Sequence, residues 1–167
     1  MNTFPISFFT ASALKMGISL DDAQVSSLIA YYHLLLFWNQ KINLFANSTS
    51  DMIVAKHFID SLAVNTILKM GGRKVIDIGS GGGFPAIPLA IVGNLAHITL
   101  VEASRKKASF LREAVNTLQL ANIEIVNKRI EDLLNLPRYC NQYDIVISRA
   151  TLKLCDFIAL GSPLLAL

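Results

Sequence analysis

The 167-residue chain is short of charge and of cysteine, and each shortage excludes a class of protein. Charged residues make up only 16% of the sequence, against 53% hydrophobic residues. This balance excludes an intrinsically disordered chain and is sufficient for a substantial core. Cys140 and Cys155 lack the spacing of metal ligands, which fits a protein of the reducing cytosol, and we expect both to be buried apolar side chains.

Long apolar runs and targeting signals are also missing. The uncharged stretch of residues 84–101 is interrupted by prolines, a glycine and polar residues, so it does not predict a membrane-spanning helix. No basic segment precedes an apolar one at the N-terminus, so secretion is not indicated. The sequence therefore predicts a cytoplasmic protein with no membrane partner.

Residues 1–73 have the apolar spacing of helices. We predict a helix over residues 4–16 and a second that begins at Asp21 or Asp22. A third begins within residues 48–51 and continues to about residue 67, where Met70-Gly71-Gly72 ends it. These residues are predicted to form an N-terminal helical region.

From Lys74 onward, short apolar runs alternate with helical stretches. The predicted strands are residues 75–78, 98–101, 123–126 and 144–147. The predicted helices cover residues 85–92, a segment capped by Ser104, residues 130–134 and residues 152–160. This alternation is typical of a parallel sheet. We therefore predict an α/β, Rossmann-like domain over residues 74–167.

The first strand ends in a glycine-rich turn, and this is the most informative stretch of the sequence. Gly79, Gly81 and Gly83 have no Cβ atoms, so a ligand can approach the backbone there. Glu102 ends the next strand, where a carboxylate can accept hydrogen bonds from both ribose hydroxyls. Together these features predict a site for an adenosine-containing cofactor.

The spacing of the glycines favours one cofactor over another. Phe84 stands where a dinucleotide-binding fingerprint has its last glycine, which argues against a nicotinamide oxidoreductase. Asp77, two residues before the first glycine, suits the cationic S-adenosylmethionine better than a pyrophosphate. A glycine turn that serves packing alone is the remaining alternative.

Five segments of the sequence, the glycine turn among them, together carry a recognisable combination of motifs. They are Trp38-Asn39-x-Lys41-x-Asn43-Leu44, Lys56-His57-Phe58-Ile59-Asp60-Ser61-Leu62, Asp77-Ile78-Gly79-Ser80-Gly81-Gly82-Gly83-Phe84-Pro85, Lys106-Lys107-x-x-Phe110-Leu111-Arg112 and Ser148-Arg149-Ala150. In this combination the chain resembles the RsmG (GidB) family, which methylates N7 of a guanine in small-subunit (16S) ribosomal RNA. In the first segment the lysine is shifted by one position from the family pattern.

The resemblance implies a class I methyltransferase fold and a set of cofactor residues. They are Gly79, Phe84, Ile130, Glu131 and Arg149, with Glu102 in place of the more usual Asp. The family has seven strands, whereas four can be counted here. We therefore expect the C-terminal strands to be missing and the fourth strand to lie at an unpaired sheet edge.

The implied reaction needs little catalytic apparatus. Guanine N7 offers a lone pair and carries no proton, so positioning suffices, with no general base, no metal and no catalytic residue unless Arg149 contributes. A surface ion pair is the alternative for Arg149. On the substrate side, the resemblance points to His57 and Asp60, which lie one helical turn apart and could pair locally.

Arg105, Lys106 and Lys107 crowd the first turn of a predicted helix, where the helix dipole disfavours cations. They are either a solvated face or a patch that contacts phosphates. Because the net charge is only +3, an RNA substrate requires recognition of shape as well.

The expected function is S-adenosylmethionine-dependent methyl transfer to guanine N7 by a monomer, with small-subunit ribosomal RNA or the assembled subunit as partner. The alternative is a non-catalytic nucleotide- or RNA-binding protein that retains the methyltransferase fold.

Overall fold

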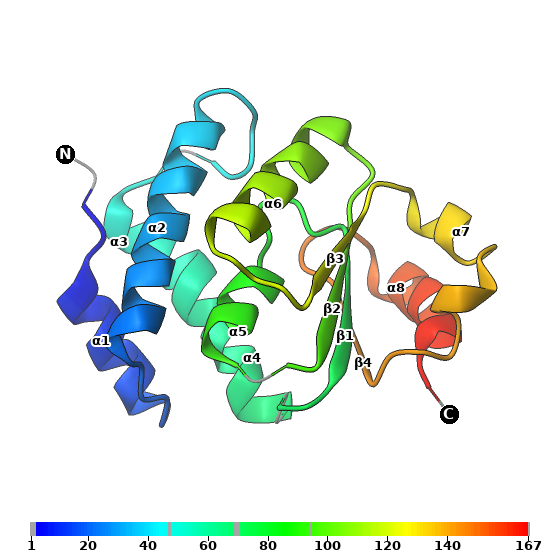
Figure 1. Cartoon of the computed structure of the whole chain (residues 1–167), viewed down its shortest axis with the longest axis horizontal. Helices are drawn as coiled ribbons and strands as arrows, with labels where there is room; N and C mark the ends of the chain where they lie inside the picture. The colour runs from blue at the N-terminus through cyan, green and yellow to red at the C-terminus, as the bar shows by residue number, and fades with distance from the viewer. Residues whose placement is uncertain (1–2, 47, 69–70, 94, 167) are drawn as a thin grey trace.

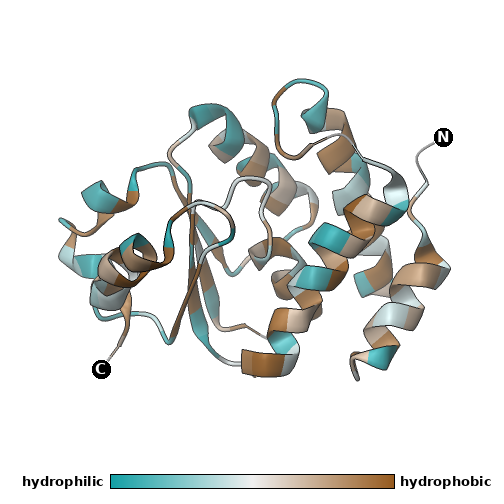
Figure 2. Cartoon of the chain, turned by 180° about the vertical axis from the view of Figure 1, so that it is seen from behind, coloured by the Kyte–Doolittle hydropathy of each residue, from teal (hydrophilic) through white to brown (hydrophobic). Residues whose placement is uncertain are grey.

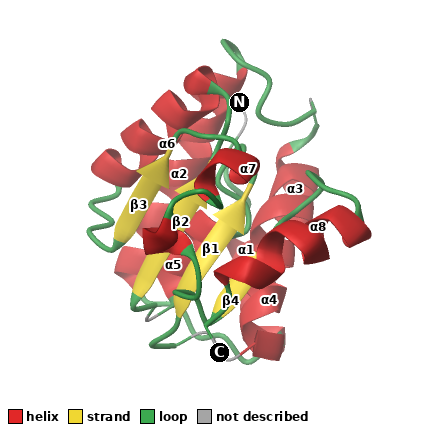
Figure 3. Cartoon of the chain, turned by 90° about the vertical axis from the view of Figure 1, so that its right-hand side faces the viewer, coloured by secondary structure: helices red, strands yellow, loops and turns green. Residues whose placement is uncertain are grey.

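The four predicted strands form, and they pair in one parallel sheet. The computed structural model describes residues 3–46, 48–68, 71–93 and 95–166. Its strands are β1 (Lys74–Ile78), β2 (His97–Val101), β3 (Ile123–Val126) and β4 (Ile145–Ile147). Their order across the sheet is β3-β2-β1-β4, and every neighbouring pair is parallel. Figure 3 shows the four arrows pointing in the same direction, which confirms the predicted α/β fold.

Helices cover both faces of this sheet. The described helices are α1 (Ile6–Lys15), α2 (Asp22–Asn39), α3 (Ser50–Ile53), α4 (Asp60–Leu68), α5 (Ala86–Val92), α6 (Arg105–Thr117), α7 (Ile130–Leu133) and α8 (Leu154–Gly161). Short 3-10 turns cover Pro137–Tyr139 and Ser162–Leu164. In Figure 1, α1 to α6 lie on one side of the sheet, and α7 and α8 lie on the other.

Helix ends follow the local signals in the sequence. Asp21 and Gln24 form a reciprocal capping box at the start of α2, in which Asp21 Oδ1 accepts from the Gln24 amide at 2.7 Å. Ser104 caps α6, as predicted. The predicted third helix is interrupted, because a π-helical segment, Val54–Ile59, joins α3 to α4. Its predicted end at Met70 lies outside the described residues.

A single hydrophobic cluster joins the N-terminal helices to the sheet. It includes Phe9 of α1, Leu35 of α2, Phe58 of the π-helical segment, Leu89 of α5 and Leu100 of β2, all buried. A second cluster fills the space under α7 and α8. Figure 2 shows hydrophobic residues along the central strands. The division of the chain into two domains at residue 73 stays a prediction.

One expectation about burial needs correction, and one about the sheet edge is confirmed. Cys155 is exposed on α8 and Cys140 is half-buried, so the prediction of two buried cysteines is wrong. The prediction that the fourth strand lies at the sheet edge is confirmed, because β4 pairs with β1 alone among the described strands. Just before β4, Tyr143 forms an isolated parallel bridge with Leu165. The Ala166 amide donates to the Tyr143 carbonyl at 2.8 Å.

The strand order creates a place for a ligand. β1 is followed by β2 on one side, whereas β4 pairs with β1 on the other side. At such a reversal, ligands of α/β proteins bind beyond the carboxyl ends of the strands. Among the described residues, no helix is both long and apolar enough to cross a membrane.

Candidate functional site

The glycine turn after β1 adopts a backbone that other residues would resist. Gly79, Gly81 and Gly83 have φ angles of 74°, 55° and 80°, in the left-handed region that favours glycine. A Cβ atom on Gly79 would meet the Thr151 side chain at 2.3 Å, and one on Gly83 would meet Ile87 Cδ1 at 2.5 Å. The turn therefore requires glycine both for its φ angles and for its close contacts.

Asp77 lies at the base of this turn and is fully buried. Neither of its carboxylate oxygens has a hydrogen-bond partner among the described residues. Burial raises the pKa of Asp77 to about 7, and the nearby Ser80 and the Arg149 cation oppose that rise. A buried carboxylate without a partner is costly, so this group is poised to hold a proton or to accept from a donor.

Glu102, after β2, connects the turn to the start of α6. One of its carboxylate oxygens accepts from the Gly81 amide and the other from the Ser104 amide, each at 2.8 Å. The residue is 8% exposed. Each oxygen keeps a second acceptor position, so Glu102 can hold the glycine turn in place and still accept from ribose hydroxyls.

Arg149, after β4, reaches across to the π-helical segment. Its Nη2 lies 2.8 Å from His57 Nδ1, and its Nη1 donates to the Lys56 carbonyl at 3.2 Å. Nη1 also lies 3.5 Å from Asp60 Oδ2. The predicted local pairing of His57 with Asp60 is thus replaced by a shared contact with Arg149, which was not foreseen because 92 residues separate Arg149 from His57.

The π-helical geometry opens a carbonyl for this contact. The Asp60 amide donates to the carbonyl of Ala55, five residues earlier. In an α-helix it would donate to Lys56, whose carbonyl instead accepts from Arg149. Single π-helical turns of this kind are frequent at functional sites.

Phe84, at the end of the glycine turn, packs against this arrangement. Its ring stacks on His57 with centroids 5.1 Å apart and an interplanar angle of 26°. The Arg149 guanidinium carbon lies 5.2 Å from the Phe84 centroid, and Tyr31 of α2 lies 5.4 Å from it. Phe84 is therefore the point where the glycine turn meets the segments around His57 and Arg149.

Two pockets open at the carboxyl end of the sheet. The first, of about 370 Å³, is lined by the glycine turn together with His57, Lys107 and Arg149. The second, of about 280 Å³, includes Ile130 and Glu131. Gly79 and Thr151 line both pockets. A ligand that occupies both pockets would contact them.

Not every predicted substrate residue reaches a pocket. Arg105 and Lys106 are exposed on the first turn of α6 and do not line the first pocket, whereas Lys107 does. Sequence reasoning missed several residues that line the first pocket, among them Phe45, Lys56 and Thr151. Asn39, which belongs to the segment that begins at Trp38, was a signal for Phe45, because its Oδ1 accepts from the amides of Leu44 at 2.9 Å and Phe45 at 3.0 Å and so holds this loop.

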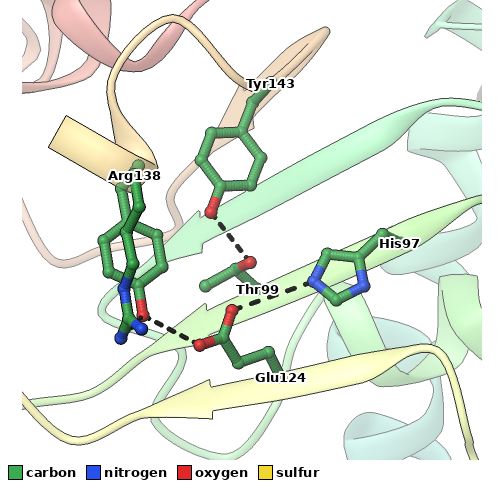
Figure 4. A network of polar contacts seen from close by, with 6 residues as sticks. His97, Thr99, Glu124, Arg138 and Tyr143 are labelled. Carbon is green, nitrogen blue, oxygen red and sulfur yellow. Dashed lines mark hydrogen bonds and ion pairs between the residues drawn. The ribbon is translucent and has the colours of Figure 1, made fainter.

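A separate polar network lies at the opposite, amino-terminal end of the strands (Figure 4). Tyr139 donates to Glu124 Oε1 at 2.8 Å and accepts from Arg138 at 2.7 Å. Tyr143 donates to Thr99 Oγ1 at 2.9 Å. These bonds attach the segment before β4 to β2 and β3. None of the predicted site residues belongs to this network.

Comparison with known proteins identifies the family of the chain. A family model described as "GidB: rRNA small subunit methyltransferase G" matches residues 24–166. A "Ribosomal RNA small subunit methyltransferase G" of Syntrophus aciditrophicus (strain SB) is 43% identical over 159 residues, which are 95% of this chain and 66% of that protein. The protein of the same name from Caldanaerobacter subterraneus subsp. tengcongensis is 41% identical over the same shares.

A solved SAM-dependent methyltransferase from Aquifex aeolicus matches with a TM-score of 0.56 and 20% identity, over 69% of this chain and 62% of that one. This likeness shows the fold alone. The chain spans about two thirds of the length of the curated relatives that it matches. With the family match covering most of the sequence, the chain belongs to the GidB family, that of rRNA small subunit methyltransferase G.

Proposed function

We propose that this chain binds S-adenosylmethionine and carries the methyl-transfer site of a guanine-N7 methyltransferase that acts on small-subunit (16S) ribosomal RNA. The observation that carries the proposal is the meeting of Phe84, His57 and Arg149 beside the glycine turn. Three segments with the family pattern, far apart in the sequence, thus contribute to one pocket.

The residues present fit this cofactor. The turn is open at Gly81, where an added Cβ atom would meet only the Gly79 carbonyl oxygen, at 3.8 Å, so a ligand can approach the backbone there. Glu102 has free acceptor positions for ribose hydroxyls. Ile130 and Glu131 line the more apolar pocket, which suits an adenine ring. Asp77, buried and without a partner among the described residues, can accept from a donor of the bound group.

Methyl transfer to guanine N7 requires mainly that the two reactants be positioned correctly. When bound, S-adenosylmethionine supplies a methyl group: the guanine N7 lone pair forms the new C–N bond while the C–S bond breaks and its electron pair stays on sulfur. N7 carries no proton, so no general base is needed. Arg149 and Phe84 hold the wall of the pocket in place, and Glu102 holds the glycine turn against α6. Alignment of the two reacting atoms is what such a site contributes.

The substrate side is basic. Lys56, Lys107 and Arg149 line the first pocket, and Arg105 and Lys106 extend the positive charge over the first turn of α6. We propose that these cations contact RNA phosphates around an unstacked guanine. A ribosomal RNA substrate implies a cytoplasmic location, and a monomer is the state we propose.

The test has two measurements on the chain. Calorimetry with S-adenosylmethionine should show binding that Glu102→Ala abolishes and that Glu113→Ala, on the exposed face of α6, leaves unchanged. Labelled methyl groups should then transfer to small ribosomal subunits or to their RNA, with 7-methylguanosine as the product in mass spectrometry. Cofactor binding without transfer to either substrate would favour a non-catalytic RNA-binding protein, and no cofactor binding would contradict the proposal.

A further inference from the structure

The contact with Arg149 decides whether Nδ1 of His57 donates or accepts a hydrogen bond. A guanidinium group has only donors, so Arg149 Nη2 at 2.8 Å from Nδ1 requires Nδ1 to accept. The ring proton is then on Nε2. No described residue forms a hydrogen bond with Nε2.

The ring is also held in a defined position and charge state. It lies between Phe84, at 5.1 Å between centroids, and Phe45, at 5.6 Å. Burial and the Arg149 cation lower the pKa of His57 to about 4, with Asp60 acting in the opposite direction and Lys56 in the same one. At neutral pH, His57 is therefore a neutral imidazole.

The lining of the first pocket and the tautomer of His57 together limit which ligand atoms the ring can bind. No carboxylate belongs to the described lining of the first pocket, whose charged groups are Lys56, Lys107 and Arg149. With Nδ1 taken by Arg149, His57 presents a donor and no acceptor. It can therefore pair with an acceptor on a base edge but not with an amino group.

We propose that His57 Nε2–H donates to O6 of the target guanine, and that Arg149 is the positioning residue that sets this tautomer. Guanine has two acceptors, N7 and O6, on its major-groove edge, whereas adenine has an amino group in place of O6. A donor on O6 selects guanine and leaves the N7 lone pair free for the methyl group. This inference rests on the function proposed above.

The first test measures the tautomer without any turnover. Nitrogen-15 NMR of the wild-type chain at pH 7 should show a His57 ring that is neutral and protonated on Nε2. Arg149→Ala should return the ring toward a mixture of tautomers. Protonation on Nδ1, or a charged ring at pH 7, would overturn the inference.

The second test compares two substitutions of similar size. In His57→Gln, the side-chain amide nitrogen can occupy the position of Nε2, so the donor is retained. In His57→Asn, the amide can replace only the Nδ1 side of the ring. We expect His57→Asn to lower kcat/KM for methyl transfer about tenfold, as expected for loss of one hydrogen bond, and His57→Gln to lower it less than about threefold. His33→Gln, on the exposed face of α2, is the matched control.

The substrate supplies the deciding comparison. Once the modified position has been mapped with the wild-type chain, RNA can be prepared with 2-aminopurine there, which keeps N7 and lacks O6. The loss caused by His57→Asn should shrink to less than about twofold on this RNA, because the hydrogen bond is already absent. If His57→Asn lowers kcat/KM equally on both RNAs while the wild-type chain is active, the proposed role of His57 is overturned and the proposed function still stands. Absence of any transfer by the wild-type chain would overturn the proposed function and this inference with it.

Discussion

Arg149 Nη2 lies 2.8 Å from His57 Nδ1. A residue just after β4 therefore contacts the π-helical segment, which precedes β1 in the sequence. The same guanidinium contacts the Lys56 carbonyl and the Asp60 carboxylate. One side chain thereby attaches the N-terminal helices to the carboxyl end of the sheet.

The first prediction concerns the pKa of His57. Burial, followed by the Arg149 cation, lowers this pKa from 6.5 to about 4, whereas Asp60 raises it. Arg149→Ala should therefore raise the His57 pKa, and Asp60→Asn should lower it. NMR titration of the three histidine rings measures both changes, with His57→Asn used to assign the signals. Shifts in the same direction for both variants would contradict this electrostatic account.

The second prediction concerns the pH dependence of stability. Burial raises the pKa of Asp77 from 3.8 to about 7, so the folded state holds a proton that the unfolded state releases. The stabilisation linked to this proton is complete below pH 3.8 and is lost as the pH rises through about 7. Denaturant unfolding at several pH values should show this loss in the wild-type chain and not in Asp77→Asn. Parallel curves for the two proteins would show that Asp77 keeps its ordinary pKa.

The third prediction separates the glycines of the turn. Gly83→Ala should destabilise the fold by about 2 kcal/mol or more, because the φ angle is unfavourable and the Cβ atom meets Ile87 and Tyr31. Gly81→Ala should cost only about 1 kcal/mol, since the space there is open. Gly82→Ala, with ordinary contacts and no positive φ, is the control. Thermal and urea unfolding measure the series, and equal losses at all three positions would contradict the structure.

The fourth prediction concerns Glu102. Its two oxygens accept from two backbone amides, and Glu102→Gln leaves only one oxygen to do so. We expect a loss of about 1–3 kcal/mol in the free energy of unfolding. Amide hydrogen exchange should locate the loosening at Gly81 or Ser104. Unchanged exchange at both amides would mean that Glu102 does not hold the turn.

The fifth prediction uses the network of Figure 4, far from the proposed site. Tyr143→Phe removes the donor to the buried Thr99 hydroxyl and should destabilise the chain by about 1–2 kcal/mol. Adding Thr99→Val should restore part of that loss, because the hydroxyl left without a partner is then gone. Cofactor binding should be unchanged in both variants, since these residues lie at the other end of the sheet. Strictly additive losses would contradict a direct bond between the two hydroxyls.

The strands could be predicted to within about a residue at each end, because short buried runs between turns leave little choice of structure. The glycine turn could also be located, since three residues with positive φ follow one another at alternate positions. The exposure of Cys155 could not be foreseen, because composition does not say which face of α8 a residue occupies.

The sequence by itself determined the strand–turn–helix unit around Gly79 and the position of Glu102, because both depend on local backbone geometry and strand spacing. Only the tertiary structure decided that Arg149 binds His57 and that Phe84 stacks on the same ring. These contacts depend on how β4 pairs beside β1 and on the π-helical turn that opens the Lys56 carbonyl, which are long-range packing outcomes that no local pattern encodes.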